Sequence, residues 1–115
     1  MANTTADYVQ MLKDQYGLKT NYKVAQFLEV SETAVRNWTK KGGTLDDSTA
    51  IIIATKLQID PAIIITECHL ERAEKQGNEL VASTYKKILK QLQKAATTGA
   101  AACLTFTVLS GIFPY

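Results

Sequence analysis

Two neighbouring side chains in the second half of the chain have the chemistry of metal ligands or catalytic groups. Cys68 carries a thiol, and His69 beside it is the single histidine of the chain. A zinc site needs about four ligands, and the one other cysteine, Cys103, is far away in the sequence. The sequence also offers no nucleophile–base pair, no phosphate-binding glycine loop and no catalytic pair of carboxylates. We therefore expect no metal, no cofactor and no enzymatic activity.

Composition and charge indicate a soluble helical protein. Its 115 residues support one domain, since domains centre on about 100–150 residues. The first residues, MANTTADYVQ, contain neither a basic start nor an apolar run, so we expect no secretory signal and reduced cysteines in a cytoplasm. The net charge is +2, and residues 1–50 contain equal numbers of basic and acidic residues. Any affinity of this half for nucleic acid must come from local placement of its basic residues.

Residues 20–38, TNYKVAQFLEVSETAVRNW, have the pattern of two short helices joined by a tight turn. Thr20 or Asn21 can cap the first helix, and Ser31 can cap the second. Ala25 lies where the two helices should cross, and a larger side chain at that point would push them apart. Apolar residues at helical spacing give each helix an inward face: Val24, Ala25, Phe27 and Leu28 in the first, and Ala34, Val35 and Trp38 in the second.

The small residue, the turn and the two valines at these offsets (Ala25, Val30, Val35) resemble the helix-turn-helix of lambda-repressor-like (Cro-type) DNA-binding proteins. One departure is Glu29, where the family usually has glycine. A left-handed conformation at a residue other than glycine costs about 1 kcal/mol, which the motif tolerates. The stretches SETAVRNWTKKGGTLDDSTA, Asp60-Pro61 and RAEKQGNELV also resemble small proteins of filamentous phages and prophages. This second resemblance covers roughly residues 5–94 and implies a bacterial host.

The resemblance implies which residues would contact DNA. In the Cro-type fold the second helix of the motif enters the major groove, and its outward positions here are Glu32, Thr33, Arg36 and Asn37. Arginine can donate two hydrogen bonds to guanine, and asparagine can pair with adenine in the same way. Phosphate contacts are expected from the start of the first helix and the end of the second: Asn21, Tyr22, Lys23, Lys40 and Lys41. Trp38 is expected in the core with Ala25, Val30 and Val35.

Cap residues predict four further helices. The first begins at Thr4 or Thr5 and ends at Gly17, with Tyr8, Met11 and Leu12 inward. The fourth begins at Asp46 or Asp47, with a stripe of Ala50, Ile51, Ala54 and Leu57 and with Ile53 beside it. The fifth runs from Pro61 to about Gln76, and Asn78 caps the sixth. The sixth helix places Val81, Tyr85, Ile88 and Leu92 at coiled-coil a and d positions, so this face either packs on the preceding helices or forms a dimer.

The chain ends in an uncharged segment, residues 95–115. Its length matches the roughly 20 residues of a membrane-spanning helix, and four lysines precede it as the positive-inside rule expects: Lys86, Lys87, Lys90 and Lys94. Its alanines and threonines fit burial against a partner subunit equally well. We therefore divide the chain into a helix-turn-helix head (1–59), two further helices (60–94) and an apolar tail (95–115), with 96–113 as the candidate membrane segment.

Two functions follow as expectations. The first is a sequence-specific regulator of transcription, repressor-like and of phage or prophage origin, that binds double-stranded DNA as a homodimer. It would be cytoplasmic, or tethered to the cytoplasmic face of the inner membrane. The alternative is a membrane-anchored or structural phage protein that uses the helical head to bind another protein. The fold class expected in both cases is all-α, a lambda-repressor-like bundle of four to five helices followed by a C-terminal helix and the tail.

Overall fold

The computed structural model describes residues 2–103, with only the backbone for residues 96–103. These residues form six helices and no strand, so the predicted all-α class is confirmed. Of the predicted apolar tail (95–115) and the candidate membrane segment (96–113), the backbone is described up to residue 103, as the end of the last helix, and the rest lies outside the described residues. The helices are α1 (Thr5–Tyr16), α2 (Asn21–Leu28), α3 (Glu32–Lys40), α4 (Asp47–Leu57), α5 (Pro61–Lys75) and α6 (Glu79–Cys103).

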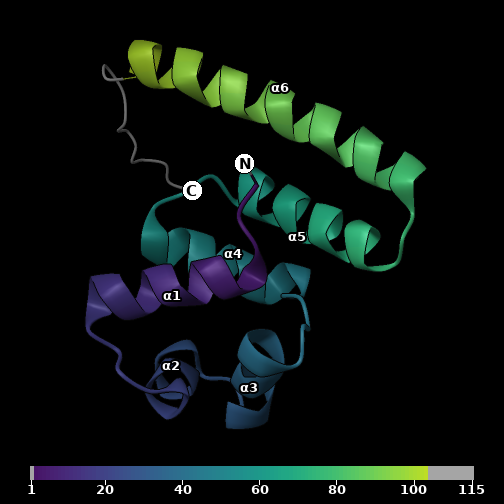
Figure 1. Ribbon diagram of the computed structural model, residues 1–115. Helices are drawn as coiled ribbons and strands as arrows, with labels where there is room; N and C mark the ends of the chain where they lie inside the picture. Colours follow the sequence, from purple (N-terminus) through teal and green to yellow (C-terminus); the bar gives the residue numbers. More distant parts are fainter. Residues whose placement is uncertain (1, 104–115) are drawn as a thin grey trace.

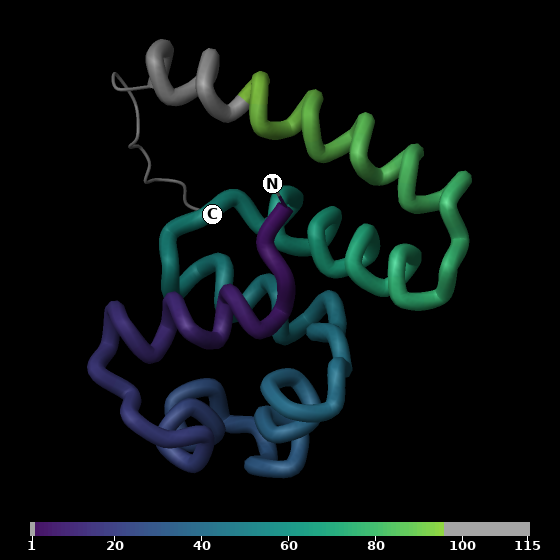
Figure 2. Tube along the Cα trace, in the orientation of Figure 1, coloured from purple at the N-terminus to yellow at the C-terminus, as the bar shows by residue number. Residues whose placement is uncertain are grey.

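Helix α5 lies between the first four helices and α6 (Figure 1). The main core joins α1–α4 and also takes in Ile64 and Cys68 of α5. A second, smaller cluster joins α5 to α6 through Leu70, Ala73, Ala82 and Leu89. The tube in Figure 2 shows α6 running back along α5. Helix α5 therefore contributes to both apolar clusters, one on each side of it.

The predicted helix ends are confirmed, and each has a hydrogen-bonding reason. Thr4, Thr20, Ser31 and Asp46 are N-caps whose side chains accept from the amide three residues further on. Asp60 caps α5 with Pro61 at its first position. Gly17 ends α1 in the left-handed conformation, with φ 66°, which glycine adopts without a steric cost.

On two helices, α4 and α6, the buried face lies one residue position away from the predicted apolar face. In α4, Ile53 is fully buried and Ile51 is 46% exposed, although the prediction put Ile51 on the inward stripe. The run Ile51-Ile52-Ile53 has no periodicity, so only packing against the rest of the fold selects the buried member. In α6 the residues buried against α5 are Ala82 and Leu89, whereas Ile88 of the predicted seam is exposed.

The turn between α2 and α3 gives a first testable prediction. Glu29 adopts the left-handed conformation there, with φ 59° and ψ 44°. We expect Glu29→Gly to stabilise the fold by about 1 kcal/mol, because glycine has no side chain to clash in this conformation. The free energy of unfolding in urea measures the change. Gln76→Gly is the matched control, because Gln76 ends α5 with φ −83°. An equal gain in that variant would contradict the explanation from backbone strain.

Candidate nucleic-acid interface

The α2–α3 unit has an apolar interior. Ala25 is 4% exposed, Val35 is fully buried, and Trp38 is 6% exposed. Val30 is half-buried against the same core, and its amide donates to the carbonyl of Ala25 at 3.0 Å. Ala25, Val35 and Trp38 therefore belong to the core, and Val30 packs against it.

The outer face of α3 carries the four residues predicted to contact bases, all of them exposed: Glu32, Thr33, Arg36 and Asn37. Arg36 Nη2 lies 3.9 Å from Glu32 Oε2, one helical turn away, and both side chains are about half exposed (49%). An exposed ion pair of this kind contributes only about 0–1 kcal/mol. Arg36 can therefore leave Glu32 at little cost, and its guanidinium is available to an acceptor outside the protein.

Asn37 is held differently, at the edge of α3 beside the following loop. Its backbone carbonyl accepts hydrogen bonds from the backbone amides of Lys41 and Gly43, at 3.2 and 2.9 Å. The side chain packs on Gly43 so closely that a Cβ at position 43 would lie 2.3 Å from Asn37 Nδ2. Gly43 thus makes room for the Asn37 amide, a relation that sequence spacing did not predict. The structure brings Arg36 to Glu32 and Asn37 to the loop.

The residues predicted to contact phosphate at the start of α2 have separate roles in the structure. The Asn21 side chain accepts from Lys13 Nζ at 3.1 Å and donates to Thr39 Oγ1 at 3.2 Å, so it ties α1, α2 and α3 together. Tyr22 is 53% exposed, and Lys23 is exposed too. The first amides of a helix have no partner within it and favour an anion. Exposed polar groups therefore surround the start of α2.

Side chains of α5 bind the loop that follows α3. Lys40 and Lys41 are exposed at the end of α3. Beyond them, Lys75 donates to the Gly42 carbonyl. Arg72 donates to Thr44 Oγ1 at 3.0 Å and to the Leu45 carbonyl at 2.9 Å. Helix α5 thus fixes the segment that directly follows α3.

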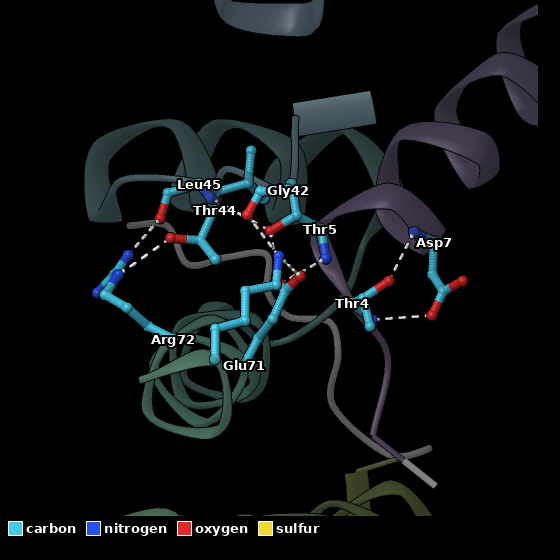
Figure 3. Close-up of polar contacts among 9 residues, drawn as sticks. Thr4, Thr5, Asp7, Gly42, Thr44, Leu45, Glu71 and Arg72 are labelled. Carbon is cyan, nitrogen blue, oxygen red and sulfur yellow. Dashed lines mark hydrogen bonds and ion pairs between the residues drawn. The ribbon is translucent and has the colours of Figure 1, made fainter. Parts of the chain in front are cut away.

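A buried carboxylate on α5 holds the start of α1. Glu71, 9% exposed, accepts from the Thr5 amide at 2.9 Å and from the Thr5 hydroxyl at 2.8 Å. Its second oxygen lies 3.0 Å from Lys75 Nζ. The Thr5 hydroxyl in turn accepts from the Leu45 amide at 3.2 Å. Figure 3 shows Thr5 and the 42–45 loop converging on Glu71 and Arg72 of α5.

A second carboxylate, Glu67, is 1% exposed and lies one turn earlier on α5. It accepts from the Asn3 amide at 2.9 Å and from the Tyr8 hydroxyl. Burial, together with the bond to Glu67, raises the pKa of Tyr8 well above its usual value. The sequence analysis did not single out either glutamate. Their spacing contained a signal, because Ile64, Glu67, Cys68 and Glu71 recur at three- and four-residue steps on one helical face.

Cys68 and His69 point to no reactive centre. Cys68 is buried, and burial raises the pKa of its thiol to about 11, so the thiolate required for nucleophilic attack is scarce at neutral pH. His69 Nε2 lies 3.2 Å from Asp47 Oδ1, and Nδ1 lies 3.3 Å from Arg72 Nη1. Within the described part of the chain, no group of three or more potential ligands is placed to hold a metal ion.

Comparison with known proteins identifies no relative of this chain. No family model, no curated protein and no solved structure matches it. Among residues 2–103, no helix is both long and apolar enough to cross a membrane.

Proposed function

We propose that this protein is a repressor-like regulator of phage or prophage origin that binds double-stranded DNA in a sequence-specific manner. In this proposal α2–α3 is a lambda-repressor-like helix-turn-helix, and α3 lies in the major groove. The observation that carries the proposal is the division of α3 into two faces. Val35 and Trp38 are buried, whereas Glu32, Thr33, Arg36 and Asn37 all face solvent.

Base reading is assigned chiefly to Arg36. Within the described part of the chain its guanidinium has one weak partner, Glu32 at 3.9 Å. It can exchange that partner for the O6 and N7 atoms of a guanine. Thr33 faces the same side and can contact a thymine methyl group or a phosphate. Asn37 can reach an adenine from the loop edge of α3, with its backbone fixed by the bonds to Lys41 and Gly43. Glu32 can accept from a cytosine N4 once Arg36 has moved.

Phosphate contacts would set the orientation of the head on the duplex. The exposed lysines at the two ends of the motif, Lys23, Lys40 and Lys41, supply charge for them. The balanced charge of residues 1–50 limits the affinity of a single head. We therefore include in the proposal a homodimer, whose two heads would read half-sites about 34 Å apart.

A salt titration of Lys40→Ala tests the phosphate assignment. We expect the variant to bind every duplex more weakly and to reduce the salt slope of binding by about 1 for each bound head, hence by about 2 for the dimer, because each head loses one phosphate contact. Fluorescence anisotropy with a random duplex and with the DNA flanking the gene measures both effects. Lys90→Ala on α6 removes the same charge away from α3 and should leave the slope unchanged. A loss confined to one sequence would contradict the assignment.

Protein binding through the same head is the second candidate function, for a membrane-anchored or structural phage protein. The balanced charge of residues 1–50 and the Glu32–Arg36 pair on the outer face favour it. The two functions differ in the same titration. Absence of duplex binding even at low salt would exclude the regulator and leave the protein-binding head.

A further inference from the structure

Helix α6 has a second stripe of uncharged residues, and no other part of residues 2–103 covers it. Its residues facing α5 are Ala82, Tyr85 and Leu89. One position away on the helix, Val81 and Ile88 are 38% and 42% exposed. The coiled-coil seam predicted from the sequence is thus divided between two faces. Tyr85 lies against α5, and Val81 and Ile88 face solvent.

The exposed stripe continues along the helix at heptad spacing. Val81, Thr84, Ile88, Gln91 and Ala95 follow one another at steps of three and four residues, and all five are exposed. They span about 21 Å of helix at 1.5 Å per residue. β-branched side chains at positions 81 and 88 are those that two-stranded packing prefers at the a position. The stripe therefore has the pattern of a helix–helix interface.

The charged side chains of this part of α6 lie off the stripe. Four lysines occur between residues 86 and 94 of α6, and none occupies a stripe position. By helical spacing they all lie on other sides of the helix: Lys86, Lys87, Lys90 and Lys94. A solvated helix face of this length would normally carry some of these charges. Leu80, at the edge of the stripe, is 80% exposed and enlarges the apolar area.

We propose that a second copy of this chain docks on the stripe, with α6 of each copy packed along α6 of the other. A two-fold interface is formed by the same patch on both subunits, so an uncharged stripe is complementary to itself. The new contact would be continuous with the α5–α6 interface, because Tyr85 lies between the two faces. The resulting core would contain α5 and α6 from both copies. The choice of a second copy as partner rests on the proposed function, in which two heads share one operator.

Sedimentation equilibrium of the full chain without DNA tests this assignment. We expect a mass of about twice the monomer's 12.6 kDa for the wild type, falling to the monomer mass in Ile88→Lys. Thr84→Lys should have the same effect, and because Thr84 is exposed this second variant decides the question if Ile88→Lys loses helicity by circular dichroism. Ser83→Lys is the matched control. It adds the same charge to an exposed position off the stripe and should remain dimeric.

A wild-type chain that stays monomeric at every concentration would overturn the inference. Stripe variants (Ile88→Lys and Thr84→Lys) that remain dimeric would overturn it too. Together with the duplex titration, the measurement separates this inference from DNA binding. A dimer that binds no DNA would refute the proposed DNA-binding function and leave the α6 interface standing. A monomer that reads a single half-site would refute the α6 interface and the homodimer, and would leave sequence-specific DNA binding standing.

Discussion

Replacing Arg36 by alanine should lower the affinity for the preferred duplex by about 1–3 kcal/mol and relax the sequence preference at one base pair. The guanidinium is the one side chain on the outer face of α3 that can donate two parallel hydrogen bonds to guanine. Its present partner, Glu32, holds it at 3.9 Å on an exposed surface, so little internal energy opposes the exchange. Anisotropy titrations at one fixed salt concentration, with the preferred duplex and single-base variants of it, measure both effects.

Glu32→Gln is the matched companion to that variant. It frees Arg36 from its ion pair and removes a negative charge that would face the DNA, so binding should stay unchanged or become tighter. If Glu32 itself accepts from a cytosine, the substitution relaxes the preference at that base instead. Unchanged affinity of Arg36→Ala for the preferred duplex would exclude base reading by Arg36.

The stability of the fold should depend strongly on Glu71. Replacing Glu71 by alanine would leave the buried amide and hydroxyl of Thr5 without their acceptor. A buried donor that loses its partner costs about 1–3 kcal/mol, so we expect the free energy of unfolding to fall by about 2–4 kcal/mol in total. Urea denaturation followed by circular dichroism at 222 nm, the usual wavelength for helix content, measures it.

Two further variants separate the contributions of acceptor and charge. Glu71→Gln keeps an oxygen that can accept from Thr5, so it should retain most of the stability. Glu74→Ala removes a carboxylate from the same helix, where it is 53% exposed and pairs with Lys86 at 3.7 Å, and should change stability by less than about 1 kcal/mol. Equal losses in Glu71→Ala and Glu74→Ala would contradict a structural role for the buried network.

Helix ends were the most predictable part of this fold, because each depends on a few neighbouring residues. A short polar side chain before an apolar run accepts from a specific amide, as Ser31 does from Ala34 at 3.1 Å. Glycine or another left-handed residue ends the helix, as at Gly17. The interior of the α2–α3 unit was predictable for the same reason. Ala25, Val35 and Trp38 all lie within two turns of the junction.

Features that depend on packing between distant segments could not be predicted. Glu67 and Glu71 are charged residues on an otherwise apolar face, and the approach of residues 3–8 supplies buried donors to both. Hydropathy patterns treat such residues as solvent-facing. The contact of Asn37 with Gly43 depends on how the loop turns back on α3. In α6, adjacent apolar residues made the buried face ambiguous by one position, and the packing of α5 decided it.

The same long-range contacts explain how the candidate site is positioned. Helix α5 holds the 42–45 loop through Lys75 and Arg72 and the start of α1 through Glu71. The loop begins where α3 ends, so these bonds fix that end of α3. Asn21 secures the other side of the unit through Thr39. The outer face of α3 is therefore presented by a helix that is tied to the rest of the fold through several elements.

Selection of duplexes from a randomised library by the wild-type chain tests the central claim most directly. If α3 reads base edges, a defined sequence should be enriched and bound about 10³-fold or more tightly than random duplex at physiological salt, and Arg36→Ala should lose the enrichment of one guanine position. Absence of any enrichment, with weak binding that is equal for all sequences or no binding at low salt, would contradict the claim. The α2–α3 unit would then serve as a structural support for a head that binds protein.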